Sequence, residues 1–213
     1  FELVTQFSIV RQVMETRTTP ASDPMSQVPG LNADLVHRLS TKPKHGNAKA
    51  HNMRSLREMQ RDDCANLIKK LSKGKSAGAL KSTLNAIYSM PLIKIEQSKA
   101  TFNPSKESQG AGQRGTLEIE MEINRQGGGK QNRKGVDGGY SVSLILGTVS
   151  SRFLLAYTSF QAPRGGTTKV KKQLDFDWAA AKASGGEDSG FVILRVIIEG
   201  VRGLDTEVLV PLK

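Results

Sequence analysis

The residues that could perform catalysis are few and poorly placed for it. The three histidines, His37, His45 and His51, lie in one polar stretch, and Cys64 is the single cysteine. A zinc site needs such ligands at characteristic short spacings, and none can be built from these four residues. Nothing in the sequence orients His51 and Cys64 as base and nucleophile. We therefore expect a chain that is not itself an enzyme, with no metal, no cofactor and no catalytic residue.

A glycine-rich and basic segment at residues 127–135 (GGGKQNRKG) has the composition of a phosphate-binding loop. Such a loop needs its lysine followed by serine or threonine at the start of a helix, where backbone N–H groups meet the phosphate. Lys130 is instead followed by Gln131, and the next element expected is a strand. We interpret the segment as a hairpin loop.

Three glutamates, Glu118, Glu120 and Glu122, alternate with apolar residues over positions 116–124. This period of two indicates a strand with one buried and one solvated face. The glutamates then form the solvated side of that strand, and they are not a catalytic pair of carboxyl groups. Trp178 is interpreted as a packing residue.

Positive charge is the strongest chemical signal in the chain. The 31 lysines and arginines against 20 acids give a net charge of +11. The segment from Arg38 to Lys81 holds twelve basic and only three acidic residues. Cations gathered on one surface attract phosphate, with an affinity that falls as salt rises. The alternative is a solubilising surface that contacts nothing.

Nine of these cations are the predicted nucleic-acid-binding residues. They would contact phosphates without reading sequence, because few aromatic residues accompany them for base stacking. Charge reversal at Arg54 and Arg57 is accordingly predicted to weaken single-strand binding. The set is Lys42, Lys44, Lys49, Arg54, Arg57, Lys69, Lys70, Lys73 and Lys75.

The elements that would carry these cations are helical. From residue 1 to 88 the apolar residues recur at three- and four-residue spacing. Asn32, Asp62 with Asp63, and Ser76 mark the starts of three helices, and residues 40–52 are interpreted as a loop. A first amphipathic helix of about four turns ends before Pro20, because a residue preceding proline avoids the helical region. Its apolar positions are Leu3, Val4, Phe7, Val10, Val13 and Met14.

After Pro91 the period changes to two. Short strands with glycine-rich turns and no long helix between them favour an antiparallel sandwich over a parallel sheet. The lack of a disulfide favours the fibronectin type III sandwich over the immunoglobulin type. Residues 181–190 are interpreted as a loosely ordered loop. Seven strands are expected, at residues 92–99, 116–124, 140–146, 152–160, 168–176, 191–199 and 206–212.

The fold class predicted is α+β in two domains, a small all-α unit followed by an all-β sandwich. The expected organisation is the end of a helical bundle (1–17), a helix-loop-helix unit (18–90) and the sandwich (91–213). The longest apolar run, at residues 191–201, is broken by Arg195 and Glu199 and is shorter than the ~20 residues of a membrane helix. We expect no membrane association, and a chain that is part of a larger protein.

The order of these parts and several strings resemble the Sec-sixty-three homology region. Residues 23–31 (DPMSQVPGL) are similar to the family's SPLLQLPHI run, and residues 89–93 (SMPLI) to its entry into the sandwich. Residues 143–149 (SLILGTV) with 154–156 (LLA) resemble its LILGEV and LIAL strand pair. Residues 203–205 (GLD) resemble its GLDQ before the last strand. The similarity extends over essentially the whole chain.

This resemblance implies the C-terminal accessory unit of a Ski-two-like DExH helicase, of the spliceosomal Brr-two type or that of the activating signal cointegrator complex. Such a unit holds no ATPase motif, packs beside the motor domains of its own chain and touches single-stranded RNA or DNA. Its sandwich docks protein partners, and it acts in the nucleus or cytoplasm. Residues 151–154 and the short basic insert at 127–135 favour this helicase branch.

Two alternatives stay open. The same region occurs in a subunit of the endoplasmic-reticulum translocon, which implies a soluble protein-interaction scaffold at the endoplasmic reticulum with no nucleic acid. A third interpretation is an isolated adaptor module whose basic face binds an acidic protein.

Overall fold

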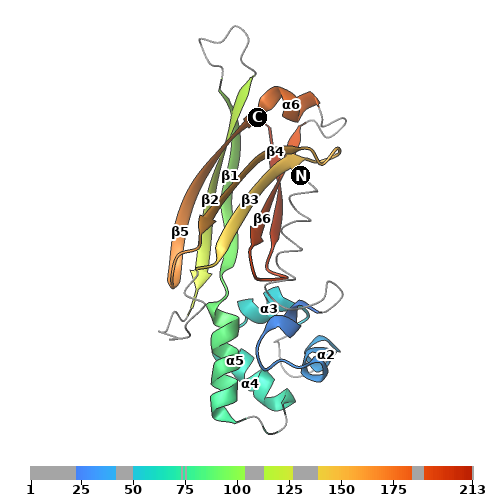
Figure 1. The fold of residues 1–213 in the computed structure, drawn as a ribbon, viewed down its shortest axis with the longest axis vertical. Helices are drawn as coiled ribbons and strands as arrows, with labels where there is room; N and C mark the ends of the chain where they lie inside the picture. Colours follow the sequence, from blue (N-terminus) through green and yellow to red (C-terminus); the bar gives the residue numbers. More distant parts are fainter. Residues whose placement is uncertain are drawn as a thin grey trace.

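Helices come first in the chain and strands follow (Figure 1). The computed structural model describes residues 23–41, 50–72, 74, 76–103, 113–126, 139–183 and 190–212. The predicted first helix at 1–17 and the glycine-rich segment at 127–135 lie outside these residues. The N-terminal elements are η1 (Pro24–Gln27), α2 (Ala33–Thr41), α3 (Met53–Glu58), α4 (Arg61–Leu71) and α5 (Ala77–Ser89).

The three helix starts predicted from the sequence are confirmed. The Asn32 side chain accepts a hydrogen bond from the Leu35 N–H at 2.9 Å, and Ser76 caps α5 in the same way. Asp62 and Asp63 lie in the first turn of α4, where acids complement the helix dipole. The helix α3 was not predicted, because its six residues carry little periodic signal and the capping box of Asn52 and Ser55 at its start was not recognised.

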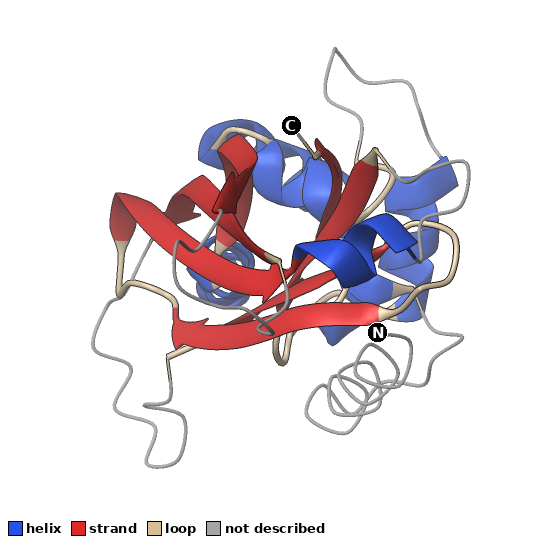
Figure 2. Ribbon diagram, turned by 90° about the horizontal axis from the view of Figure 1, so that it is seen from above, coloured by secondary structure: helices blue, strands red, loops and turns tan. Residues whose placement is uncertain are grey.

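In the described part of the chain, seven strands form two antiparallel sheets, as the alternating pattern predicts. One sheet has the order β1-β2-β5 and the other β4-β3-β6-β7, and Figure 2 shows the strands with several helices behind them and one in front. The structure is therefore a group of helices followed by a two-sheet β-sandwich. The strands are β1 (Leu92–Asn103), β2 (Arg114–Arg125), β3 (Ser141–Thr148), β4 (Leu154–Gln161), β5 (Gly166–Asp177), β6 (Phe191–Ile198) and β7 (Thr206–Pro211).

One prediction within the sandwich is wrong in part. The start of the expected loop at 181–190 belongs to a short helix, α6 (Trp178–Ala183), which follows β5 directly. Trp178 is buried and stacks on Phe176 with ring centroids 5.8 Å apart. A Cβ atom at Gly115 would lie 2.5 Å from the Trp178 ring, so the indole packs directly on the β2 backbone. This confirms Trp178 as a packing residue, and the Asp177 side chain accepts from the Ala180 N–H at 3.0 Å at the start of α6.

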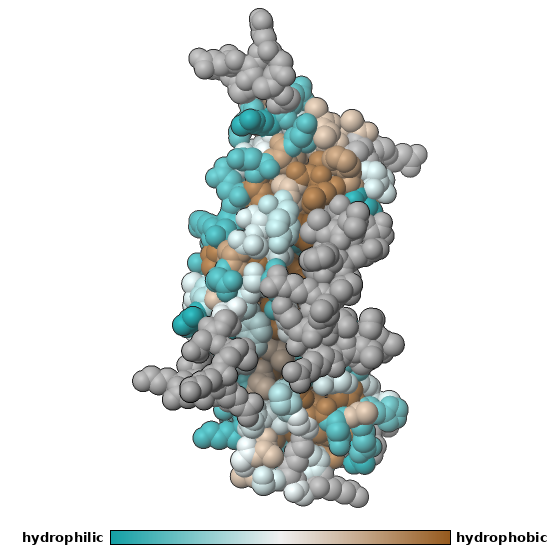
Figure 3. All heavy atoms as spheres, in the orientation of Figure 1, coloured by the Kyte–Doolittle hydropathy of each residue, from teal (hydrophilic) through white to brown (hydrophobic). Residues whose placement is uncertain are grey.

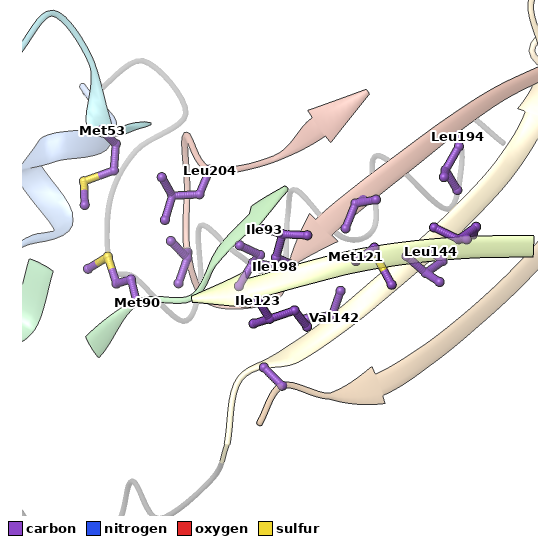
Figure 4. Packing of buried hydrophobic residues seen from close by; sticks show 14 of the residues in the cluster. Met53, Met90, Ile93, Met121, Ile123, Val142, Leu144, Leu194, Ile198 and Leu204 are labelled. Carbon is purple, nitrogen blue, oxygen red and sulfur yellow. The ribbon is translucent and has the colours of Figure 1, made fainter. Parts of the chain in front are cut away.

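The core lies between the sheets and continues into the helices. The inward side chains of β2, from Leu117 to Ile123, are buried against those of β3 and β6. Figure 4 shows the same cluster passing from Met121 and Ile123 through Leu204 to Met53. The helices thus sit at one end of the sandwich and share its apolar core. None of the described helices is long and apolar enough to span a membrane.

The carbonyls at the end of α5 join the helices to the sandwich. Three successive carbonyls, which no further turn of helix can satisfy, accept hydrogen bonds from three different residues. The Tyr88 carbonyl accepts from the Gln126 N–H at 2.9 Å, and the Ser89 carbonyl accepts from Arg125 Nε at 2.8 Å. The Met90 carbonyl accepts from Arg57 Nε at 2.9 Å.

A second contact joins η1 to the turn between β6 and β7. The Gln27 amide donates to the Arg202 carbonyl at 2.7 Å and accepts from the Arg202 N–H at 2.9 Å. Gly203 lies beside it with φ +78°, and a Cβ there would stand 2.8 Å from Pro24 Cβ and 3.1 Å from Met53 Cβ. Residues 23–31 and 203–205, far apart in sequence, are therefore packed together.

We predict that Gly203→Ala lowers the free energy of unfolding by about 2–4 kcal/mol, because it combines a positive φ with a close approach to backbone-attached carbons. Gly165→Ala is the matched control, since Gly165 has φ +87° and nothing within 4 Å of its added Cβ. This control should cost about 1 kcal/mol. Urea unfolding measures both, and equal losses would show that the contact with Pro24 and Met53 is not tight.

Candidate nucleic-acid surface

The predicted cations divide into those used inside the protein and those left on its surface. Arg57 lies inside. It is 2% exposed, and besides Met90 its guanidinium donates to the carbonyl and the side-chain oxygen of Asn124 on β2 at 2.9 and 3.1 Å. Burial lowers the pKa of the Arg57 guanidinium, and the neighbouring Tyr88 opposes that shift.

Arg54, one turn earlier on α3, reaches the other side of the junction. Its Nη2 donates to the Leu204 carbonyl at 2.9 Å and to the Thr206 hydroxyl at the start of β7. Its Nη1 also lies 3.6 Å from the Glu58 carboxylate. Arg54 and Arg57 therefore tie one short helix to two separate parts of the sandwich end that faces it.

The contacts of Arg54 and Arg57 with the sandwich make the charge-reversal experiment ambiguous as a test of phosphate binding. Charge reversal at Arg54 and Arg57 would remove the hydrogen bonds between helices and sandwich, so a loss of binding would not isolate a phosphate contact. We leave Arg57 out of the candidate surface for this reason. The count of basic residues in the sequence could not separate Arg57 from an exposed cation, because a buried arginine and an exposed one count alike.

Two further arginines hold the helices to one another. Arg38 on α2 pairs with Asp34 at 2.7 Å and donates to the Leu71 carbonyl at the end of α4. Arg61 donates to the Asn85 side chain on α5. The Arg57 and Arg61 guanidinium carbons lie 5.1 and 5.4 Å from the centre of the Tyr88 ring, a distance at which cation–π attraction is favourable.

Cys64 and the described histidines form no site. Cys64 is buried in the helical part, and burial raises the pKa of its thiol to about 11. His37 and His51 are exposed on the surface. Within the described part of the chain, no group of three or more histidine, cysteine, aspartate or glutamate side chains could hold a metal ion.

The exposed cations lie at the far end of the helices from the sandwich. Lys69 and Lys70 are in the last turn of α4 and are exposed, and Lys81 is exposed near the start of α5. These two helix ends meet at the hairpin farthest from the strands (Figure 1). We call Lys69, Lys70 and Lys81 the hairpin-tip lysines. The remaining predicted residues, Lys42, Lys44, Lys49, Lys73 and Lys75, lie outside the described residues.

The lysines of the sandwich differ because acids face them. On the outer face of the β1-β2-β5 sheet, Glu118 is opposite Lys99 and Glu122 is opposite both Lys94 and Lys169. Lys171 forms an ion pair with Glu120 at 3.1 Å. The glutamates are therefore the solvated side of β2, as predicted, and Figure 3 shows hydrophilic surface along the side where β5 lies.

Comparisons with known proteins identify no family. No family model and no curated protein matches the sequence. Among solved structures, the chain is similar to the X-ray structure of Northeast Structural Genomics Consortium target SoR45, with 9% identity and a TM-score of 0.26 over 57% of this chain and 82% of that one. It is also similar to a protein from Archaeoglobus fulgidus, with 14% identity and a TM-score of 0.27 over 56% of this chain and 98% of that one. Similarity this weak carries no argument about function.

We predict that Arg57→Met lowers the free energy of unfolding by about 2–4 kcal/mol, because the buried carbonyls of Met90 and Asn124 lose a charged donor. Arg57→Lys should recover only part of this, since an ammonium cannot reproduce the fork of guanidinium N–H groups. Lys70→Met, at an exposed lysine in the same helical part, should change the value by no more than about 0.5 kcal/mol. Urea unfolding of the three variants measures the difference. An Arg57→Met variant as stable as Lys70→Met would show that the junction does not depend on Arg57.

Proposed function

We propose that this chain is the non-catalytic C-terminal accessory unit of a Ski-two-like helicase, with the Sec-sixty-three homology region that its sequence resembles. The hairpin-tip lysines contact the phosphates of a single-stranded nucleic acid, and the sandwich docks protein partners. The motor domains, which would supply ATP hydrolysis, belong to the same parent chain. The observation that carries the proposal is the exposure of these lysines at the end of a helical hairpin whose base is fastened to the sandwich.

The resemblance gains support from the way its strings are packed. The run at 23–31 lies against the string at 203–205, because Gly203 approaches Pro24 and Gln27 bonds Arg202 beside it. Because a glycine is needed where the two approach, the two strings have a physical reason to occur together.

The strand order supports the fibronectin type among the sandwiches expected. In an immunoglobulin constant domain the fourth of seven strands belongs to the sheet of the first, second and fifth. Here the fourth strand, β4, pairs with β3 in the sheet of the sixth and seventh. This arrangement departs from the constant-domain pattern and agrees with the lack of a disulfide in the sequence.

The proposed binding mechanism involves no catalytic residue. An exposed lysine is a mobile point charge on a flexible stem, which suits contact with a strand that moves past it. Phosphate contacts of this kind carry no sequence information and add affinity that salt removes. The junction at the end of α5 keeps the hairpin at a fixed place relative to the sandwich, so a partner that holds the sandwich also positions the lysines.

The alternative function is a scaffold of the endoplasmic-reticulum translocation machinery that binds proteins and no nucleic acid. One observation favours it. Arg54 and Arg57, two of the nine predicted cations, are used within the protein, so the charge available for phosphate is smaller than the sequence indicates. The binding experiment below separates the two functions.

We predict that the chain binds single-stranded RNA at low salt and that Lys69→Glu with Lys70→Glu weakens this binding. The slope of log K against log salt should fall by about 1.4, since each phosphate contact to a single strand contributes about 0.7. Fluorescence anisotropy over a salt series measures the slope, with single-stranded DNA of the same sequence compared in parallel.

The matched control is Lys99→Glu with Lys169→Glu, which makes the same change in net charge on the outer face of the β1-β2-β5 sheet. An equal loss in this control would mean general electrostatic attraction and would contradict a site at the hairpin tip. If the unaltered chain does not bind either strand at low salt, the scaffold function replaces the helicase function.

A further inference from the structure

The strands at the borders of the two sheets differ in charge. β1 and β5 border one sheet, and β4 and β7 border the other. A border strand presents unpaired N–H and C=O groups, and proteins usually protect it with charges, proline or a bulge. β1 carries two lysines, a glutamate and a bulge after Ile95, β5 carries three lysines and two aspartates, and β7 carries Glu207 and Pro211. From Ala156 to Gln161, β4 is regular in register and has neither a charge nor a proline.

The hydrogen-bonding pattern shows which backbone groups of β4 face outward. Directly after the strand, the Ala162 N–H donates to the Tyr140 carbonyl at 2.7 Å. Hydrogen-bonded and non-hydrogen-bonded pairs alternate along an antiparallel ladder. Counting back from Ala162, every second residue of β4 is therefore turned to β3. Tyr157 and Ser159 lie between these residues, so they direct their N–H and C=O groups to the free edge.

The side chains of β4 are only partly covered. The inward-facing side chains of Ala156, Thr158 and Phe160 are half-buried, whereas those of β3 are buried. On the other side of the strand, Tyr157 is 48% exposed. The next strand along the chain, β5, belongs to the other sheet. The sandwich is therefore open along β4.

A second copy of β4 is complementary to this edge. In an antiparallel pair centred on Thr158, Tyr157 of each copy lies opposite Ser159 of the other, and these are the residues whose backbone groups face outward. On the inner side, Ala156 lies opposite Phe160 of the other copy, a small side chain against a large one. A second copy of β5 would instead bring its lysines together, which is unfavourable across strands.

We propose that two copies of the chain associate by antiparallel pairing of β4 with β4, which joins their β4-β3-β6-β7 sheets into one continuous sheet. The proposal does not depend on nucleic-acid binding or on the helicase function. The association is weak and reversible, because an edge contact buries less area than a stable interface. Arg152 and Arg164 lie just outside the two ends of β4, and the chain carries a net charge of +11. The copies therefore repel each other, and salt strengthens the dimer by screening this repulsion.

Sedimentation equilibrium of the full chain without nucleic acid tests the proposal. The protein is measured from about 10 to 500 μM and at about 0.05 and 0.5 M salt. Ser159→Pro removes an outward N–H and leaves the ladder with β3 intact, since proline is tolerated on an edge strand where its nitrogen faces solvent. Ser159→Lys places a charge on the edge. Gln173→Lys is the matched control, because it adds the same charge at an exposed position of β5.

We expect the unaltered chain to dimerise as its concentration rises, with an association constant at least about threefold larger at the higher salt concentration. At that salt, Ser159→Pro and Ser159→Lys should each lower the constant at least about tenfold. Gln173→Lys should leave it within about twofold, because salt screens an added charge away from the edge. Urea unfolding verifies that each variant is folded, and Ser159→Lys decides the test if Ser159→Pro does not fold.

Four results would overturn the proposal. A chain that stays monomeric at every concentration and salt would exclude a second copy and leave the edge to a strand of another protein. A dimer that both Ser159 variants leave unchanged would be formed by a different surface. An equal loss in Gln173→Lys would mean general charge repulsion without a role for the β4 edge. A dimer that salt weakens would be held by ion pairs between the copies, which this edge does not offer.

Discussion

The structure depends on how the last carbonyls of α5 are satisfied. A helix that ends inside a protein leaves acceptors that cost free energy unless something donates to them. Here the donors come from the end of β2 and from α3, through Gln126, Arg125 and Arg57. Because each donor belongs to an element distant in sequence, the end of α5 can be completed only when the helices and the sandwich are both in place. The junction therefore couples the folding of the two parts.

This coupling explains why arginines and lysines have different places in the helical part. The junction needs several N–H groups in a fixed plane, directed at neighbouring carbonyls, and a guanidinium supplies them. An ammonium is a strongly hydrated point charge, and its burial without a carboxylate is costly. Arg38, Arg54, Arg57 and Arg61 are thus used for internal contacts, while Lys69, Lys70 and Lys81 remain at the surface. A count of positive charge overestimates what is available to a ligand unless it separates the two residue types.

The difference between internal and exposed cations also limits how much of the candidate site could be predicted from the sequence. All seven strands were located from the sequence, although only β2 alternates clearly, and β3 and β6 are buried on both faces. Local signals sufficed for the helix starts at Asn32 and Ser76, where a side chain bonds a backbone N–H three residues on. The helices α3 and α6 were missed although each starts at a local cap, where Asn52 accepts from the Ser55 N–H and Asp177 accepts from the Ala180 N–H. The candidate site was predicted in residue type and region. Whether a given cation faces water depends on carbonyls up to 150 residues away, which no local pattern contains.

The two outer faces of the sandwich differ in the polarity of their side chains. On the β1-β2-β5 sheet, lysines of the outer strands flank the glutamates of the central one, so the face is polar without a strong net charge. On the β4-β3-β6-β7 sheet, isoleucines occupy the equivalent outward positions and the Arg195–Glu207 ion pair lies among them. Hydrophobic burial is proportional to the apolar area removed from water, so a sheet with aliphatic residues on both faces is most stable when both are covered. The charged face meets water, whereas Ile145, Ile193 and Ile197 on the apolar face are at most 3% exposed. The sandwich therefore has one polar and one apolar outer face, and the hairpin-tip lysines lie apart from both.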